Sequence, residues 1–239
     1  MGKYVKIMLQ VLIAYVIFSV LSQYLDTYIL ITILLIFISL FILFGNRKKD
    51  SNLHFLEKEC DVSKYLEFVN EKLIDKDQSK YLLYLAYGNL YDGNVKAVED
   101  DIYKINISEF KSNELMIYEE LKLKLLYNNN DIEQYEKKWD EISEGKYGNK
   151  YYNDLMVLKA PLYLMKKEYS KLVDLMFDLI PKQRQVYRIV ELEYYLATAY
   201  RAQGKIEDAV AVLEFVTKRD FKLDQVTKGN DLLEELKEN

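Results

Sequence analysis

The same apolar spacing occurs four times in this chain, each copy 37 residues after the one before it. Within each copy the apolar or aromatic residues follow at steps of three, four and three, which places them on one stripe of an α-helix. The copies are Val95-Val98-Ile102-Ile105, Ile132-Tyr135-Trp139-Ile142, Tyr169-Leu172-Met176-Leu179 and Ile206-Ala209-Leu213-Val216. A fixed period of this size is typical of helical repeat arrays, whose helix pairs bury their apolar faces against their neighbours. We therefore expect an all-α repeat region that serves as a binding surface.

The last copy resembles a known repeat family. Residues 190–218, VELEYYLATAYRAQGKIEDAVAVLEFVTK, resemble a tetratricopeptide repeat (TPR), and the resemblance extends more weakly over about residues 79–218. The matching packing positions are Leu196, Ala197, Tyr200, Gly204, Ala209, Leu213 and Val216. The resemblance implies a TPR-like α-helical solenoid of about four helix pairs. Residues 229–239 are expected to form a capping helix over its exposed end.

The turn within each pair is less regular than the stripes. Gly204 supplies a permissive turn residue in the last copy, and Gly93 does so in the first. Asn129-Asn130 and Lys166-Lys167 stand at the same turn in the second and third copies. The copies before the last are therefore degenerate, although the first keeps its glycine.

Two uncharged stretches occupy the N-terminus. Residues 7–21 and 28–44 contain no charged side chain. With its flank, the first stretch would be about 33 Å long as a helix, and the second about 25 Å. A bilayer core is about 30 Å thick, so both stretches can cross it, the second only just. We predict a transmembrane helical hairpin. A cleaved signal peptide is less favoured, because a second apolar stretch follows at once and no A-x-A-like site precedes it.

Positive charges predict the orientation of this hairpin. Lys3 and Lys6 precede the first span, and the connection between the spans contains Asp26 but no basic residue. A basic cluster follows the second span: Arg47, Lys48 and Lys49. The positive-inside rule then places both termini in the cytoplasm, in a cell-membrane protein with two spans. We expect the basic cluster to contact anionic lipid headgroups.

Charge divides the chain into two predicted domains. Residues 1–49, the anchor, carry five basic residues and one acidic residue. Residues 50–239, the cytoplasmic TPR-like domain, carry 28 basic and 37 acidic residues, a net charge of −9. An acidic domain argues against a nucleic-acid partner, whose phosphates require a basic face.

The sequence offers little for catalysis. His54 is the only histidine and Cys60 the only cysteine, so neither a disulfide within the chain nor a cluster of Cys and His metal ligands is expected. No phosphate-binding glycine loop is present. Acidic pairs such as Glu119-Glu120 are expected on solvated helix faces. We predict no cofactor, no catalytic residue and no enzymatic activity.

The TPR resemblance also implies where a partner would bind. In that family the first helix of each pair lines a concave groove, and the 37-residue step carries this register along the chain. The groove candidates are Leu83, Tyr87, Tyr91, Lys124, Tyr127, Asn128, Tyr194 and Arg201. Tyrosine suits such a surface because it gives a large contact area with few rotatable bonds, although each tyrosine could instead be a packing residue. Only Lys124, Asn128 and Arg201 could grip a carboxylate, so a C-terminal carboxylate ligand is not expected.

These observations favour a membrane-anchored scaffold that docks a peptide or protein partner in this groove. Envelope assembly, secretion and division are all compatible settings. The alternative is a subunit of a membrane complex that recognises its partner through the hairpin, with the repeats as a spacer. A third hypothesis, less favoured, is an enzyme with an unrecognised site.

Overall fold

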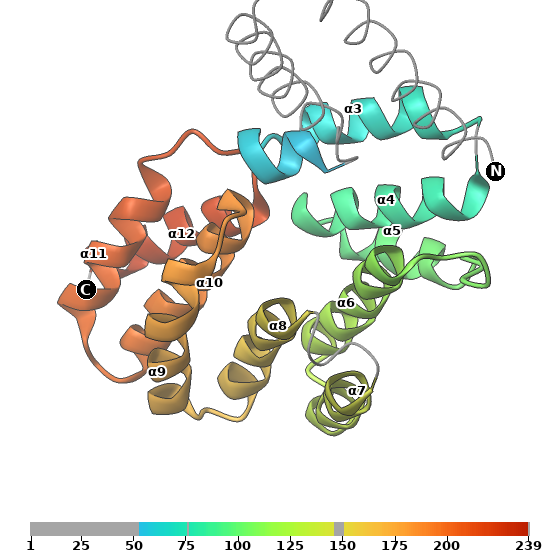
Figure 1. Ribbon diagram of the computed structural model, residues 1–239. Helices are drawn as coiled ribbons and strands as arrows, with labels where there is room; N and C mark the ends of the chain where they lie inside the picture. Colours follow the sequence, from blue (N-terminus) through green and yellow to red (C-terminus); the bar gives the residue numbers. More distant parts are fainter. Residues whose placement is uncertain (1–52, 76, 146–150, 239) are drawn as a thin grey trace, which may run out of the picture. The chain divides into compact units, whose positions relative to one another are not determined.

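Residues 53–75, 77–145 and 151–238 are described by the computed structural model, and they are built from helices (Figure 1). No β-strand occurs within these ranges, which confirms the all-α class. The elements are η1 (Phe55–Glu59), α3 (Val62–Leu73), α4 (Gln78–Tyr91), α5 (Val95–Ile102), α6 (Ser112–Asn128), α7 (Ile132–Glu144), α8 (Tyr152–Met165), α9 (Tyr169–Leu179), η2 (Ile180–Lys182), α10 (Val186–Ala202), α11 (Ile206–Thr217) and α12 (Asp224–Glu238).

The predicted membrane hairpin and its basic cluster lie outside the described residues. Among the helices that are described, none is long and apolar enough to cross a bilayer. The hairpin and its orientation therefore stay predictions.

All four apolar stripes lie on helices. These helices are α5, α7, α9 and α11, and their first residues, Val95, Ile132, Tyr169 and Ile206, are spaced by 37 residues. Each packs against the helix that precedes it. The first stripe departs from the pattern because α5 ends at Ile102. Ile105 lies beyond this end, in a turn where its N–H donates to the Ile102 carbonyl, and its side chain is still buried in an apolar cluster.

The turn before each of these helices has the same geometry in all four copies. Gly93, Asn130, Lys167 and Gly204 all have a positive φ, between 54° and 80°. In every copy the next N–H bonds a carbonyl five residues back, as in Asn94 to Asn89, which is the hydrogen bond of a Schellman helix end. Asn130 and Lys167 thus adopt a left-handed conformation that glycine adopts more easily. The repeat is more regular in its backbone than in its sequence.

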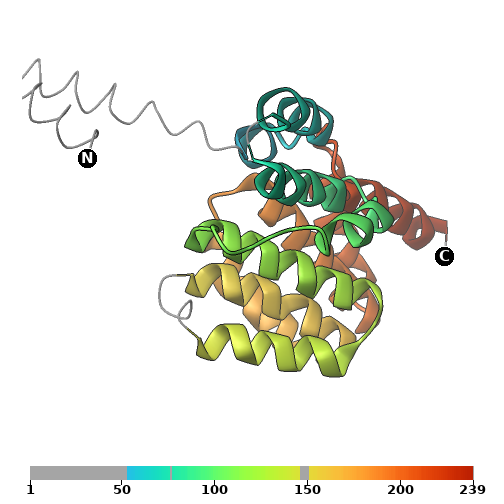
Figure 2. The same cartoon turned by 90° about the vertical axis from the view of Figure 1, so that its right-hand side faces the viewer.

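Consecutive helices pack side by side along this part of the chain. Figure 2 shows α6, α8 and α7 as adjacent rows, and all three pairs of these helices are in contact. The last helix, α12, packs against α10 and α11 through Leu232, Leu233 and Leu236. It begins at Asp224, five residues before the predicted start, so its first turn adds polar side chains to this end.

The first and last elements of the described region meet in a seam. The Lys222 N–H donates to the Cys60 carbonyl at 3.0 Å, and the Lys222 ammonium lies 3.2 Å from the Asp61 carboxylate. Leu56 and Val62 share one buried apolar cluster with residues of the C-terminal elements, such as Leu223. The η1 segment also contacts α10 (Figure 1).

Candidate functional site

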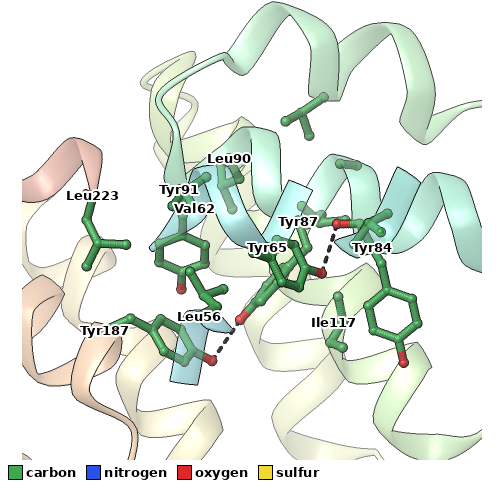
Figure 3. Close-up of a cluster of buried hydrophobic side chains, with 14 of the residues drawn as sticks. Leu56, Val62, Tyr65, Tyr84, Tyr87, Leu90, Tyr91, Ile117, Tyr187 and Leu223 are labelled. Carbon is green, nitrogen blue, oxygen red and sulfur yellow. Dashed lines mark hydrogen bonds between the residues drawn. The ribbon is translucent and has the colours of Figure 1, made fainter. Parts of the chain in front are cut away.

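The predicted groove residues of α4 are buried. Leu83, Tyr87 and Tyr91 have no exposed surface. Figure 3 shows Tyr87 and Tyr91 pointing from α4 toward Tyr187 of α10, whose hydroxyl lies 3.1 Å from that of Tyr87. The Tyr91 and Tyr187 rings meet edge to face, with centroids 4.9 Å apart. The expectation that these three α4 side chains face an accessible groove is not met, because Tyr187 of α10 packs against Tyr87 and Tyr91, and Leu83 belongs to the same buried apolar cluster.

Glu120 of α6 accepts hydrogen bonds inside this closed region. Tyr87 and Tyr91 donate to its Oε1 at 3.2 and 3.0 Å, and Arg188 of α10 donates to its Oε2 at 2.7 Å. Glu120 is only 2 % exposed, so the expected solvated position is wrong for this residue. A carboxylate held by two hydroxyls and a guanidinium joins three helices at one point.

Lys124 lies one turn further along α6 and extends the same network. Its ammonium is 2.7 Å from the Tyr91 hydroxyl and 2.8 Å from Glu191 Oε1 of α10. The Tyr195 hydroxyl donates to the same Glu191 oxygen at 2.9 Å. Lys124 is also 3.3 Å from Glu120 Oε1, so it bridges two buried carboxylates. Two cations and two carboxylates therefore occupy the interior, and their charges balance.

The local electrostatics keep the Glu120 carboxylate ionised and the Tyr87 and Tyr91 hydroxyls protonated. Burial alone would raise the pKa of Glu120, but the neighbouring charges of Arg188 and Lys124 outweigh it and lower that pKa to about 2. Burial, together with the negative charge of Glu120, raises the pKa of Tyr87 and Tyr91 well above the usual range. Both hydroxyls therefore keep their protons and remain donors. We call Glu120, Lys124, Arg188, Glu191 and their tyrosine partners the buried network.

The other end of the predicted groove, between α6 and α10, is accessible. A cavity of about 300 Å³ lies between α6, α10 and α12, with Leu90 and Val95 at one side. Its polar and aromatic lining is Lys124, Tyr127 and Asn128 of α6, Glu191, Tyr194 and Tyr195 of α10, and Asp224, Gln225 and Lys228 of α12. We call this cavity the inner pocket. Four of the eight predicted groove residues line it: Lys124, Tyr127, Asn128 and Tyr194.

The walls of the inner pocket are flat and aromatic. Tyr127 and Tyr195 meet edge to face with ring centroids 6.1 Å apart, and Tyr194 lies at the same distance from Tyr195. Tyr127 and Tyr194 are only partly buried, and Asn128 is exposed at the rim. The floor is the Lys124–Glu191 ion pair, whose side chains are 6 % and 1 % exposed. The pocket thus shares its floor with the buried network.

The remaining predicted residue, Arg201, lies outside the inner pocket. Its guanidinium is exposed and forms an ion pair with Glu235 of α12. It therefore attaches the last helix to α10, and it does not join the other candidates.

A larger and more open hollow, of about 1000 Å³, lies over α5, α6 and α7. None of the eight predicted residues lines it. Lys138 on its wall is 2.9 Å from Glu119, and the ring of Tyr103 beside it is 90 % exposed. Its lining combines charged side chains, such as Glu133 and Lys137, with the rings of Tyr103 and Tyr118.

Four important residues of α10 were missed in the sequence: Tyr187, Arg188, Glu191 and Tyr195. The signal was present, because stepping back from Tyr194 by three and then four residues gives Glu191 and Tyr187 on the same helix face. The α12 side chains of the inner pocket were missed because α12 was expected to begin later. Comparison of the chain with protein families, with curated proteins and with solved structures found no match. Within the described residues, no cluster of three or more His, Cys, Asp or Glu side chains has the arrangement of a metal site.

Proposed function

We propose that this chain is a membrane-anchored, TPR-like scaffold that docks a peptide or protein partner at the inner face of the membrane. The observation that carries the proposal is the inner pocket. Residues chosen from one repeat register, Lys124 and Tyr127 on α6 and Tyr194 on α10, line a single open cavity. A catalytic step forms no part of the proposal.

The size of the pocket limits what the partner inserts. Small-molecule sites have volumes of about 300–1000 Å³, and this one is at the lower end. The inner face of α4 is closed, so an extended segment cannot lie along the whole wall. One or two side chains of the partner enter the pocket, while the rest of it contacts the rim. The predicted hairpin would confine both molecules to the membrane surface and raise their effective concentration.

The test is photo-crosslinking of the full chain in the membranes of the cells that produce it. A photoreactive phenylalanine analogue replaces Asn128 at the pocket rim, and in a matched control it replaces Tyr103 beside the other hollow. We expect a discrete crosslinked partner from position 128 and not from position 103. The product should disappear in the Tyr127→Ala/Tyr194→Ala double variant, whose helix content should be unchanged by circular dichroism. A product that survives this double substitution would exclude docking in the inner pocket.

One observation favours the alternative function, in which the hairpin recognises the partner and the repeats act as a spacer. Most of the inner face of α4 is used for internal packing, which leaves only a small part of the expected groove accessible. Exchanging residues 1–49 for an unrelated two-span hairpin separates the two proposals. Loss of the partner from this chimera, with its repeats intact, would support recognition by the hairpin. Retention would support the pocket.

A further inference from the structure

We infer that the inner pocket receives a flat, uncharged group that carries a hydrogen-bond donor, such as the phenol of a tyrosine in the partner, and that it rejects carboxylates and cations. This inference rests on the proposed docking function and specifies its ligand. Three features of the pocket carry it: its paired charges, an unpartnered oxygen and its aromatic walls.

The charges that line the pocket are already neutralised by one another. Lys124 lies 2.8 Å from Glu191 on the floor, and Lys228 lies 2.5 Å from Asp224 at the rim. These are the four charged side chains of the lining. An incoming carboxylate or guanidinium would lose its hydration and find no unpaired counterion, unless it broke an existing ion pair. The pocket therefore disfavours charged groups of either sign.

One buried side-chain atom of the lining has no hydrogen-bond partner in the described part of the chain. Gln225 lines the pocket, and its Oε1 is buried without a hydrogen-bond partner among the described residues. This oxygen is shielded from solvent, so a ligand donor reaches it when the Gln225 side chain turns toward the pocket. The new hydrogen bond then removes the cost of a buried, unpaired acceptor. An uncharged donor meets this need without disturbing the two ion pairs.

The walls select the shape of the group. Tyr127 and Tyr194 flank the pocket with their rings partly accessible, and the third ring, that of Tyr195, is packed against both. Aromatic walls favour flat partners, which gain edge-to-face or offset contacts with them. A phenol combines a flat ring with an uncharged donor, so it satisfies both the walls and Gln225.

Four small probes test this with the full chain in nanodiscs, by NMR line-broadening titrations up to 10 mM. N-acetyl-L-tyrosinamide is the expected ligand, with a Kd of about 1 mM given the modest affinity of ligands of this size. N-acetyl-4-carboxy-L-phenylalaninamide replaces the phenol hydroxyl with a carboxylate, and N-acetyl-L-argininamide carries a cation. Both should bind at least about tenfold more weakly. N-acetyl-L-phenylalaninamide lacks the donor and should bind severalfold more weakly than the tyrosine amide.

A matched variant isolates the contribution of the unpartnered oxygen. Gln225→Leu removes the acceptor and leaves an apolar side chain of similar size, so the tyrosine and phenylalanine amides should then bind equally well. Helix content measured by circular dichroism shows that the variant is folded. Tighter binding of either charged probe, or no saturation by any probe at 10 mM, would overturn the inference. So would an unchanged preference for tyrosinamide in Gln225→Leu.

The failures of the two proposals can be told apart. If a partner is crosslinked from position 128 but the segment in contact carries a carboxylate or cation in the pocket, the ligand class is wrong and docking stands. If tyrosinamide binds as expected but no partner is crosslinked, the pocket chemistry stands and docking of a macromolecule is wrong.

Discussion

The two ends of the inner wall use the same residue types for different purposes. On α4, Tyr87 and Tyr91 are fully buried and donate to Glu120. Between α6 and α10, Tyr127 and Tyr194 are partly accessible and line the inner pocket. The difference in burial depends on which element packs against each group of tyrosines. The first part of α10 closes over α4, whereas the second part faces α12 across the pocket. A tyrosine on a repeat face is therefore accessible to a partner only where the next layer leaves space.

The largest effect is expected from Glu120→Leu, a substitution at the closed end of the predicted groove, where Tyr87 and Tyr91 are buried. The substitution leaves the Arg188 guanidinium without a close carboxylate, because its next acidic neighbour, Asp154, is 3.9 Å away. Removing one partner of a buried ion pair costs about 3–5 kcal/mol, so the free energy of unfolding should fall by that amount. Chemical unfolding of the full chain in detergent, followed by circular dichroism, measures it.

Glu136→Leu is the control for this variant, since Glu136 forms an exposed ion pair with Lys166. Its loss should cost less than about 1 kcal/mol. Equal losses in the two variants would mean that the buried network contributes no more than a surface contact.

Acid should weaken the closed end selectively. The pKa of Glu120 is lowered from its ordinary value of 4.5 to about 2 in the folded chain. Its contribution is therefore fully present above pH 4.5 and is lost as the pH falls toward 2. This contribution is about 3 kcal/mol of unfolding free energy. Unfolding curves measured from pH 7 down to pH 2 should show this loss, and Glu120→Leu should show a smaller one.

Glu193, on α10, is a control for this pH dependence, because its pKa is raised where that of Glu120 is lowered. Burial raises its pKa from 4.5 to about 7, and Arg219, 4.0 Å away, offsets this only in part. The folded state thus disfavours the charged form, and the penalty grows between pH 4.5 and pH 7. Glu193→Gln should increase stability by about 1–2 kcal/mol above pH 7 and have no effect below pH 4.5. A destabilised variant at pH 8 would contradict this assignment.

The smallest effect comes from removing single hydroxyls at the two ends. Tyr91→Phe takes one acceptor from the Lys124 ammonium and one donor from Glu120, so it should lower the unfolding free energy by about 1–2 kcal/mol. Tyr194→Phe should change it by less than about 0.5 kcal/mol, since its ring is partly accessible. Urea unfolding of both variants provides the measurement. Equal costs would remove the distinction between a closed and an open end.

The sequence predicted the elements of the described region better than their arrangement. The stripes marked four helices, and the 37-residue step marked four turns, including the two in which Asn130 and Lys167 replace glycine. A repeat pattern records how a helix packs on its neighbours in sequence. It does not record which distant helices meet, such as α4 and α10, whose Tyr87 and Tyr187 hydroxyls lie 3.1 Å apart.

The same limitation explains the outcome for the candidate site. Lys124, Tyr127 and Tyr194 were found from the register because the pocket lies where that register predicts a wall. Glu120 was assigned to solvent because the pairing of Glu120 with Lys124, four residues on, also occurs on exposed helix faces, and its other cationic partner, Arg188, is 68 residues away. Long-range charge pairs of this kind become visible only when the backbone is known.

The seam between Lys222 and Cys60 has a consequence for how the chain folds. An array with separate ends can begin to form at any repeat and grow outward. Here the first and last elements complete each other's core, which requires contact between residues about 160 positions apart. Such a contact slows folding and makes it more cooperative. The last helices therefore have to be synthesised before the first can reach their final stability, so the newly made chain stays incomplete until its C-terminal residues have left the ribosome.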